Sequence, residues 1–203
     1  MTNQKKVLII SPHPDDGILG CGATIAKLLE EGAEVKYVIL SWAGQGFTNE
    51  EIKNALKTLG IKESQQLLLN YEVRNFPYCS SAIREELRGI RESFKPNLIL
   101  CHNSHDIHQD HQIASQEAFR VFREESLWGY VLPWNLREFK FDMFYIIEKK
   151  HLDIKLVSLK KLISQQERFY YNPQKIEAEA ITFGMFRRKE YAEAFEILSQ
   201  IIK

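Results

Sequence analysis

The feature that most constrains the fold is a series of short apolar runs separated by segments of helical length. The runs KVLIIS (6–11), EVKYVILS (34–41), QLLLN (66–70) and NLILCH (97–102) have the length of strands. Continuous apolar runs such as the first are typical of strands buried on both faces. Strands that alternate with helices at this spacing indicate βαβ units. We therefore expect a Rossmann-like three-layer α/β fold with a mostly parallel sheet and helices on both faces.

Apolar spacing and capping residues predict the helices between these runs. We expect helices over about 18–32, 49–59 and 82–94, and from the polar segment after residue 102 to about residue 123. The rest of the chain is less regular. There we expect strands at 127–135 and 140–148 and two closing helices at 154–169 and 188–202.

Length and composition place the chain among ordinary globular proteins. With 203 residues it can form one sizeable core, so we expect a single domain over 1–203. Lysine plus arginine and aspartate plus glutamate both number 27, which gives no general reason to expect nucleic acid or an anionic membrane as partner. The apolar runs are too short to span a bilayer, and the N-terminal segment does not resemble a signal peptide. Three cysteines without a CxxC pair argue against disulfides, so we expect a reduced, cytoplasmic protein.

Two polar clusters follow predicted strands. HPDD at 13–16 comes after the first strand, and HQDH at 108–111 follows the strand at 97–102. Five of the six histidines lie at position 13 or between 102 and 111. The carboxyl ends of parallel strands border the crevice in which α/β proteins bind ligands. We therefore expect the two clusters to meet in space.

The residue types in these clusters fit a metal site. His13 and Asp16 are three positions apart, as are His108 and His111, so each pair shares a face once the backbone turns helical. A catalytic zinc ion takes three nitrogen or oxygen ligands and keeps one position open for water, whose pKa falls to about 7. His13, Asp16 and one histidine of the second pair supply such a set. Asp15 then suits a general base, and the other histidine suits an oxyanion donor.

The two segments SPHPDDGILGCGATIAKL and HNSHDIHQDHQIA resemble the PIG-L/LmbE-like N-acetylglucosaminyl deacetylases, whose signatures read roughly (A/P)HPDDE and HxDH. SQQERFYYNP, Gly184 and YAEAF are similar to the carboxyl-terminal part of that family. The resemblance implies a zinc-dependent N-deacetylase that converts an N-acetylated sugar conjugate to acetate and a free amine. It also implies that Fe²⁺ can replace zinc, and it leaves a homo-oligomer open.

Carried over position by position, the resemblance implies a role for each residue of the two clusters. His13, Asp16 and His111 would be the metal ligands, with Asp15 as general base. The remaining two would be His108, which stabilises the oxyanion or acts as acid, and Asp110, which orients a neighbouring imidazole.

One position departs from the family pattern, because Gly17 stands where the family has glutamate. No proposed ligand is lost, so we expect catalysis to survive. The missing carboxylate affects which groups support the metal ligands and which substrate is chosen, and the sequence leaves both open. Arg74, beyond the third strand, is predicted to hold a substrate hydroxyl, carboxylate or phosphate, with a solvated arginine as the equal alternative. We expect His102 and His105 to be polar loop residues rather than metal ligands, and His151 to lie on the surface.

Two other functions share part of this pattern. Two histidines and a carboxylate also form the facial triad of non-haem iron oxygenases, although that chemistry has no use for Asp15. The second alternative is a sugar-conjugate-binding protein that has lost catalysis, with Gly17 as a first sign. The substitution Asp15→Asn separates an enzyme from a binding protein, because hydrolysis should collapse while the metal stays bound.

Overall fold

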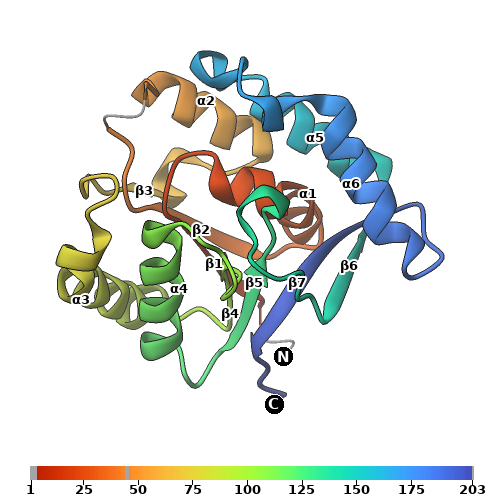
Figure 1. The fold of residues 1–203 in the computed structure, drawn as a ribbon. Helices are drawn as coiled ribbons and strands as arrows, with labels where there is room; N and C mark the ends of the chain where they lie inside the picture. The colour runs from red at the N-terminus through yellow and green to blue at the C-terminus, as the bar shows by residue number, and fades with distance from the viewer. Residues whose placement is uncertain (1–3, 44–45, 203) are drawn as a thin grey trace.

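The computed structural model describes residues 4–43 and 46–202, which form one mixed sheet in the order β3-β2-β1-β4-β5-β7-β6 (Figure 1). The strands are β1 (Lys6–Ser11), β2 (Glu34–Ile39), β3 (Gln66–Leu68), β4 (Leu98–His102), β5 (Ser126–Tyr130), β6 (Met143–Ile147) and β7 (Tyr191–Ser199). The pairs from β3 to β5 are all parallel, whereas β7 is antiparallel to both β5 and β6. The expected α/β fold with a mostly parallel sheet is confirmed.

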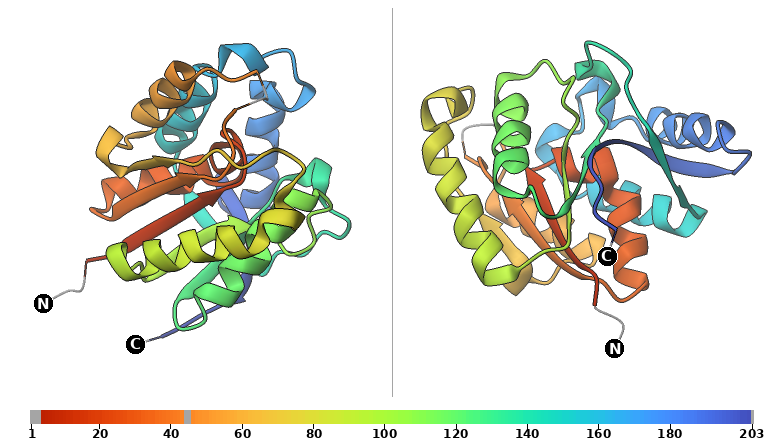
Figure 2. Two further views of the ribbon diagram at one scale, coloured as in Figure 1. Left: turned by 90° about the vertical axis from the view of Figure 1, so that its left-hand side faces the viewer. Right: turned by 90° about the horizontal axis from the view of Figure 1, so that it is seen from below.

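Helices cover both faces of the sheet, which gives the expected three layers (Figure 2). The longer helices are α1 (Asp16–Glu30), α2 (Asn49–Leu59), α3 (Phe76–Phe94), α4 (Gln109–Val121), α5 (Lys149–Leu159) and α6 (Pro173–Met185). Val7 and Ile9 of β1 belong to the cluster that contains α1, α2 and α5, while Leu8 and Ile10 belong to the cluster with α3 and α4. Because successive side chains of a strand point to opposite faces, one apolar run supplies both clusters.

The expected closing helix at 188–202 is wrong. Residues 191–199 form β7, whose first six residues are buried between β5 and β6. The alanines and glutamates of YAEAF favour a helix, but tertiary contacts override this propensity. Glu193 is buried, pairs with Lys155 at 2.7 Å and accepts hydrogen bonds from the backbone N–H groups of Ala23 and Thr24, where α1 departs from helical geometry at Cys21.

Other boundaries also differ from the sequence prediction. The helix expected at 82–94 begins at Phe76, because Pro77 lies in its first turn, where proline is compatible with a helix. The segment 154–169 is helical only up to Leu159, as the end of α5, and continues in short 3₁₀ turns. The helix at 49–59 is confirmed, with Thr48 capping it by accepting a hydrogen bond from Glu51 N.

The order of the strands decides where the two polar clusters lie. β1 is in the middle of the parallel part, with β2 on one side and β4 on the other. The chain therefore proceeds outward from β1 in one direction and returns to its other side with β4. Ligands of open α/β sheets bind at such a switch point, beyond the carboxyl ends of the strands. No helix within the described ranges is long and apolar enough to cross a membrane.

Candidate active site

The turn from β1 to α1 is fixed by hydrogen bonds within the HPDD motif. The Ser11 hydroxyl donates to the carbonyl of His13 at 2.5 Å and accepts from Gly17 N at 3.0 Å. The backbone N–H of His13 donates to Asp16 Oδ2 at 2.9 Å. In this turn, hydrogen bonds from side chains to backbone groups take the place of bonds between backbone groups, and they hold the motif at the carboxyl end of β1.

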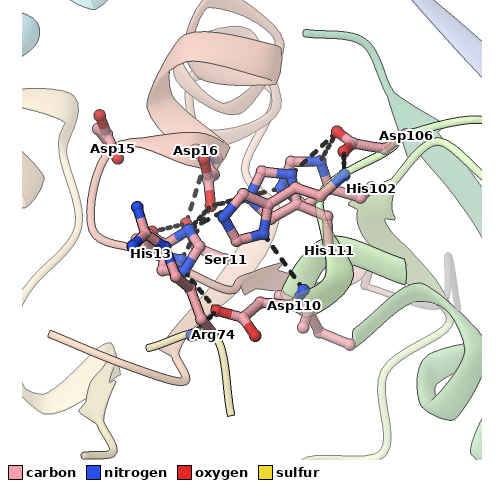
Figure 3. A network of polar contacts seen from close by, with 12 residues as sticks. Ser11, His13, Asp15, Asp16, Arg74, His102, Asp106, Asp110 and His111 are labelled. Atoms are coloured by element: carbon pink, nitrogen blue, oxygen red, sulfur yellow. Dashed lines mark hydrogen bonds and ion pairs between the residues drawn. The ribbon is translucent and has the colours of Figure 1, made fainter. Parts of the chain in front are cut away.

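The second cluster is organised around the beginning of α4. Asp106 Oδ1 accepts from His108 N at 2.8 Å, and His108 Nδ1 accepts from the backbone N–H of Asp110 at 3.2 Å. His108 is therefore the N-cap of α4, and His111 lies in the first turn of that helix. The predicted meeting of the two clusters is found in the structure (Figure 3).

Three donor atoms converge on one point. His13 Nδ1 lies 3.1 Å from His111 Nε2 and 3.2 Å from Asp16 Oδ2, and His111 Nε2 lies 3.3 Å from Asp16 Oδ2. Ligand atoms bound 2.1 Å from one tetrahedral ion lie about 3.4 Å apart. The donor set and its spacing therefore fit a zinc or iron ion.

A carboxylate contacts the outer ring nitrogen of each candidate ligand histidine, His13 and His111. His13 Nε2 lies 3.1 Å from Asp110 Oδ2, and His111 Nδ1 lies 2.9 Å from Asp106 Oδ2. Each imidazole can donate its N–H to that carboxylate, which leaves the inward-facing nitrogen unprotonated. This is the usual arrangement of histidine ligands, in which the outer partner fixes the tautomer and the ring orientation.

Ring orientation separates His108 from these histidines. The rings of His108 and His111 are stacked, with centroids 4.3 Å apart and 23° between their planes, whereas the planes of His13 and His111 differ by 52°. An imidazole lone pair lies in its ring plane, so stacked rings cannot direct lone pairs at one ion. Because His108 Nδ1 already accepts a hydrogen bond, the neutral ring carries its proton on Nε2.

Without a cation, the cluster holds protons in place of the ion. Burial lowers the pKa of His13, but Asp16 and Asp110 outweigh it and raise the pKa to about 9. Burial likewise lowers the pKa of His111, while Asp16 and Asp106 raise it to about 10. Burial also opposes the charge of Asp16, yet the imidazoles hold the pKa of its carboxyl well below the usual range. The site therefore favours positive charge at its centre.

Asp15 lies apart from His102 and His111, on the opposite side of Asp16 (Figure 3). Its Oδ2 accepts a hydrogen bond from the Tyr171 hydroxyl at 3.0 Å. Burial and the neighbouring charge of Asp16 raise the pKa of Asp15 to about 6, against the opposing effects of His13 and Tyr171. A carboxylate with a pKa near neutrality suits general base catalysis.

A cavity of about 590 Å³ opens over these groups. Its lining includes six residues singled out from the sequence, namely His13, Asp15, Asp16, Arg74, His108 and His111. Asp110 lies beneath and accepts from the backbone N–H of Arg74 at 2.6 Å, where Arg74 has a positive φ of 65°. That conformation is uncommon for a residue with a side chain, and the hydrogen bond to Asp110 holds it.

Several lining residues were missed by the sequence analysis. Trp134 and Tyr170 stack with centroids 4.7 Å apart, and Arg168 donates to the Tyr170 hydroxyl at 2.7 Å. They come from irregular segments after β5 and α5. The only sequence signal was the family-like segment SQQERFYYNP, which carries Arg168, Tyr170 and Tyr171.

Two expectations about histidines outside the motifs are wrong. His102 is not a loop residue but the last residue of β4, as the apolar run at 97–102 already indicated, and it is fully buried beside Asp16 and Asp106. His151 is also buried, and its Nε2 lies 2.7 Å from Glu30 Oε2.

The structure explains the absence of glutamate at position 17. A Cβ atom on Gly17 would stand 2.4 Å from the hydroxyl oxygen of Tyr37 and 3.1 Å from Ile9 Cγ2. Tyr37, from β2, is fully buried and donates to the Ser11 hydroxyl at 3.3 Å. The tyrosine ring thus occupies the space that a side chain at position 17 would need.

Fold and site together define the class of protein: an α/β protein with a His-Asp-His candidate metal site at the switch point of its sheet. A match to the family described as GlcNAc-PI de-N-acetylase (PIG-L) covers residues 8–122, and the chain belongs to this family. It is 29% identical over 169 residues to the uncharacterized deacetylase YaiS of Escherichia coli K12, covering 78% of this chain and 90% of YaiS. It is 32% identical over 126 residues to diacetylchitobiose deacetylase of Thermococcus kodakarensis, covering 54% of this chain and 46% of that enzyme.

Solved structures show the same fold. The conserved protein TT1542 of Thermus thermophilus superposes with a TM-score of 0.79 at 24% identity, covering 97% of this chain and 96% of TT1542. GalB of Pseudomonas putida KT2440, a 4-carboxy-2-hydroxymuconate hydratase, superposes with a TM-score of 0.77 at 17% identity, covering 98% of both chains. Because the fold also carries a hydratase, it does not by itself define the reaction.

Proposed function

We propose that this protein is a single-domain, zinc-dependent N-deacetylase that removes the acetyl group from an N-acetylglucosamine-type sugar conjugate, with Fe²⁺ as the alternative ion. The observation that carries the proposal is the triangle of His13 Nδ1, Asp16 Oδ2 and His111 Nε2, with edges of 3.1–3.3 Å, at the floor of a cavity. Family membership and relatives named deacetylases support the reaction type.

Each group of the site has a part in amide hydrolysis. A dication held by His13, Asp16 and His111 would supply Lewis-acid activation of a water molecule. Asp15 accepts a proton from the attacking water, and the Tyr171 hydroxyl holds its carboxylate. His108 donates from Nε2 to the oxyanion that develops on the acetyl carbonyl. The proton taken up by Asp15 is then available to the leaving amine.

The cavity also suggests the chemistry of the rest of the substrate. Arg74 and Arg168 line it together with the indole of Trp134. Guanidinium groups bind carboxylates and phosphates, and an aromatic face suits a sugar ring. We therefore expect conjugates that carry an anionic group to be better substrates than neutral glycosides, and Arg74→Ala to raise KM more than it lowers kcat.

The proposal includes a reduced, cytoplasmic location and a small-molecule substrate. Its support is that Cys21, Cys79 and Cys101 are free in the structure and that the residues fitting catalysis face a cavity of sugar-conjugate size.

The first experiment is elemental analysis of the purified protein together with His111→Ala. About one zinc or iron ion per chain, lost in the variant, is the expected result. A panel of N-acetylglucosamine conjugates is then assayed for released amine and acetate, with Asp15→Asn as the second variant. We expect that variant to keep its metal and to lose activity by about 10²–10⁴-fold.

The alternatives give different results in the same experiments. A non-haem iron oxygenase would consume dioxygen and release no acetate. A sugar-conjugate-binding protein would bind members of the panel with equal affinity in the wild type and in Asp15→Asn, without turnover. Absence of metal in the wild type after zinc and iron are supplied would contradict the proposed function.

A further inference from the structure

His102 is a buried imidazole at the centre of the site, and none of the proposed roles in hydrolysis falls to it. It is the last residue of β4 and is 0% exposed. Its ring stacks on that of His111, with centroids 3.7 Å apart and 15° between the planes, and it contacts the ring of Tyr130. Among the described residues, neither ring nitrogen makes a hydrogen bond of good geometry. An unsatisfied buried polar group costs about 1–3 kcal/mol, so its presence calls for an explanation.

Distance alone would allow His102 to be a metal ligand, because Asp16, His102 and His111 have donor atoms within reach of one ion. The ring geometry excludes this set. Two nearly parallel rings 3.7 Å apart cannot both hold the same ion in their planes. His111 has the better placed partners, since its Nδ1 is bound to Asp106 and its Nε2 faces His13 and Asp16. His102 therefore lies beside the ligands without being one.

Its two nitrogens face the two carboxylates that organise the site (Figure 3). His102 Nε2 lies 3.4 Å from Asp16 Oδ2, and His102 Nδ1 lies 3.3 Å from Asp106 Oδ2. Asp16 is a proposed ligand, and Asp106 holds the ring of the ligand His111. The ring of His102 thus bridges two residues on which the ion depends.

The two carboxylates differ in how much they depend on His102. Asp106 has another donor on each oxygen, His108 N on Oδ1 and the ring of His111 on Oδ2. Asp16 has the backbone N–H of His13 on Oδ2. With an ion bound, the nitrogens of His13 and His111 that face Asp16 would be ligands and could not donate to it. Loss of the His102 ring would then leave Asp16 with one donor, the backbone N–H of His13, whereas Asp106 stays held on both oxygens.

We propose that His102 is a positioning residue of the metal site, whose Nε2, 3.4 Å from Asp16 Oδ2, attracts that carboxylate and holds the ligand in place. This rests on the proposed metal site and adds a residue outside both sequence motifs. Residues that hydrogen-bond to metal ligands typically contribute 10–100-fold to metal affinity.

Three substitutions test the role of the ring. His102→Phe keeps an aromatic ring against His111 and Tyr130 but removes both nitrogens. His102→Gln places an amide where Nε2 lies, and His102→Asn places one where Nδ1 lies. His151→Phe is the matched control, because it also replaces a buried histidine, away from the cavity.

The readouts are zinc affinity, by competition with a chromophoric chelator, and the visible absorption spectrum of the Co²⁺-substituted protein. We expect His102→Phe and His102→Asn to bind zinc roughly 10–100-fold more weakly and to change the Co²⁺ spectrum. His102→Gln should stay within about threefold of the wild type, and His151→Phe should match it. Thermal melts of the metal-free proteins report folding separately. If His102→Phe does not fold, the zinc affinities of His102→Gln and His102→Asn test the proposal instead, because both side chains end in an amide and differ only in length.

Wild-type affinity and spectrum in His102→Phe would show that the ring only fills space, and would overturn the proposal. Wild-type zinc affinity in His102→Asn but not in His102→Gln would show that the important contact is to Asp106 rather than Asp16, and would also overturn the proposal. A wild-type protein that binds neither zinc nor Co²⁺ would instead contradict the proposed function, so the two failures are distinguishable.

Discussion

Replacing Gly17 with alanine tests the packing that distinguishes this chain from the family pattern, and it needs no substrate. The added Cβ would stand 2.4 Å from Tyr37 Oη, 3.0 Å from Tyr37 Cζ and 3.1 Å from Ile9 Cγ2. Overpacking of a buried site costs about 1–3 kcal/mol, against which alanine gains at most about 1 kcal/mol of helix propensity. Because a contact of 2.4 Å lies far inside van der Waals distance, we expect the upper part of the overpacking range and a net loss of roughly 1–2 kcal/mol, which corresponds to a fall in Tm of roughly 2–8 °C for a chain of this size.

The matched control is Gly89→Ala. Gly89 is exposed in the middle of α3, and a Cβ there meets no atom within 4 Å. The same substitution should therefore raise stability by about 0.5–1 kcal/mol. Thermal and urea unfolding of both variants measure the difference, and opposite signs are the expected result.

A double-mutant cycle identifies the atom responsible. Tyr37→Phe removes the hydroxyl oxygen that is nearest to the added Cβ. In that background Gly17→Ala should cost about 1 kcal/mol less than in the wild type, because the two sites are coupled by contact. If Gly17→Ala were as stable as the wild type, or equally costly in both backgrounds, Tyr37 would not be what excludes a side chain at position 17.

Further predictions concern protons and metal. Tyr171→Phe removes a hydrogen bond that stabilises ionised Asp15, so the pKa of Asp15 rises and the acidic limb of the kcat/KM profile moves to higher pH. His13 and His111, with pKa values of about 9 and about 10, are protonated at pH 7, so one ion must displace both protons. Zinc affinity should therefore rise about 100-fold per pH unit between pH 6 and 8, and calorimetry in buffers of different ionisation enthalpy should count two released protons; release of none would refute the assignment. Chelation should lower Tm by about 5–10 °C relative to protein with free metal at 100 times Kd, and an unchanged Tm would argue against a folded-state metal site.

Much of the fold and site could be predicted from local patterns. The apolar runs, the helix capped by Thr48 and the alternation of strands and helices indicated the parallel sheet. The strand-end positions of HPDD and HQDH indicated that they meet, because carboxyl ends of parallel strands share one edge. The C-terminal strand could not be found this way. Its buried Glu193 is acceptable only because Lys155 and the backbone of α1 satisfy it, and those partners are distant in sequence.

The sequence by itself determined the α/β class and the residue types of a metal site, because these depend on periodicity and on spacing within a few residues. It also indicated that the two motifs meet, because each follows a strand of a parallel sheet. Only the tertiary structure decided which histidines converge and which stack, because ring orientation depends on Asp106 and Asp110 as outer partners. It also decided that Tyr37 fills the space beside Gly17 and that His102 stands against Asp16. The contacts of Tyr37 with Gly17 and of His102 with Asp16 join residues tens of positions apart, and their geometry is set by packing rather than by any local pattern.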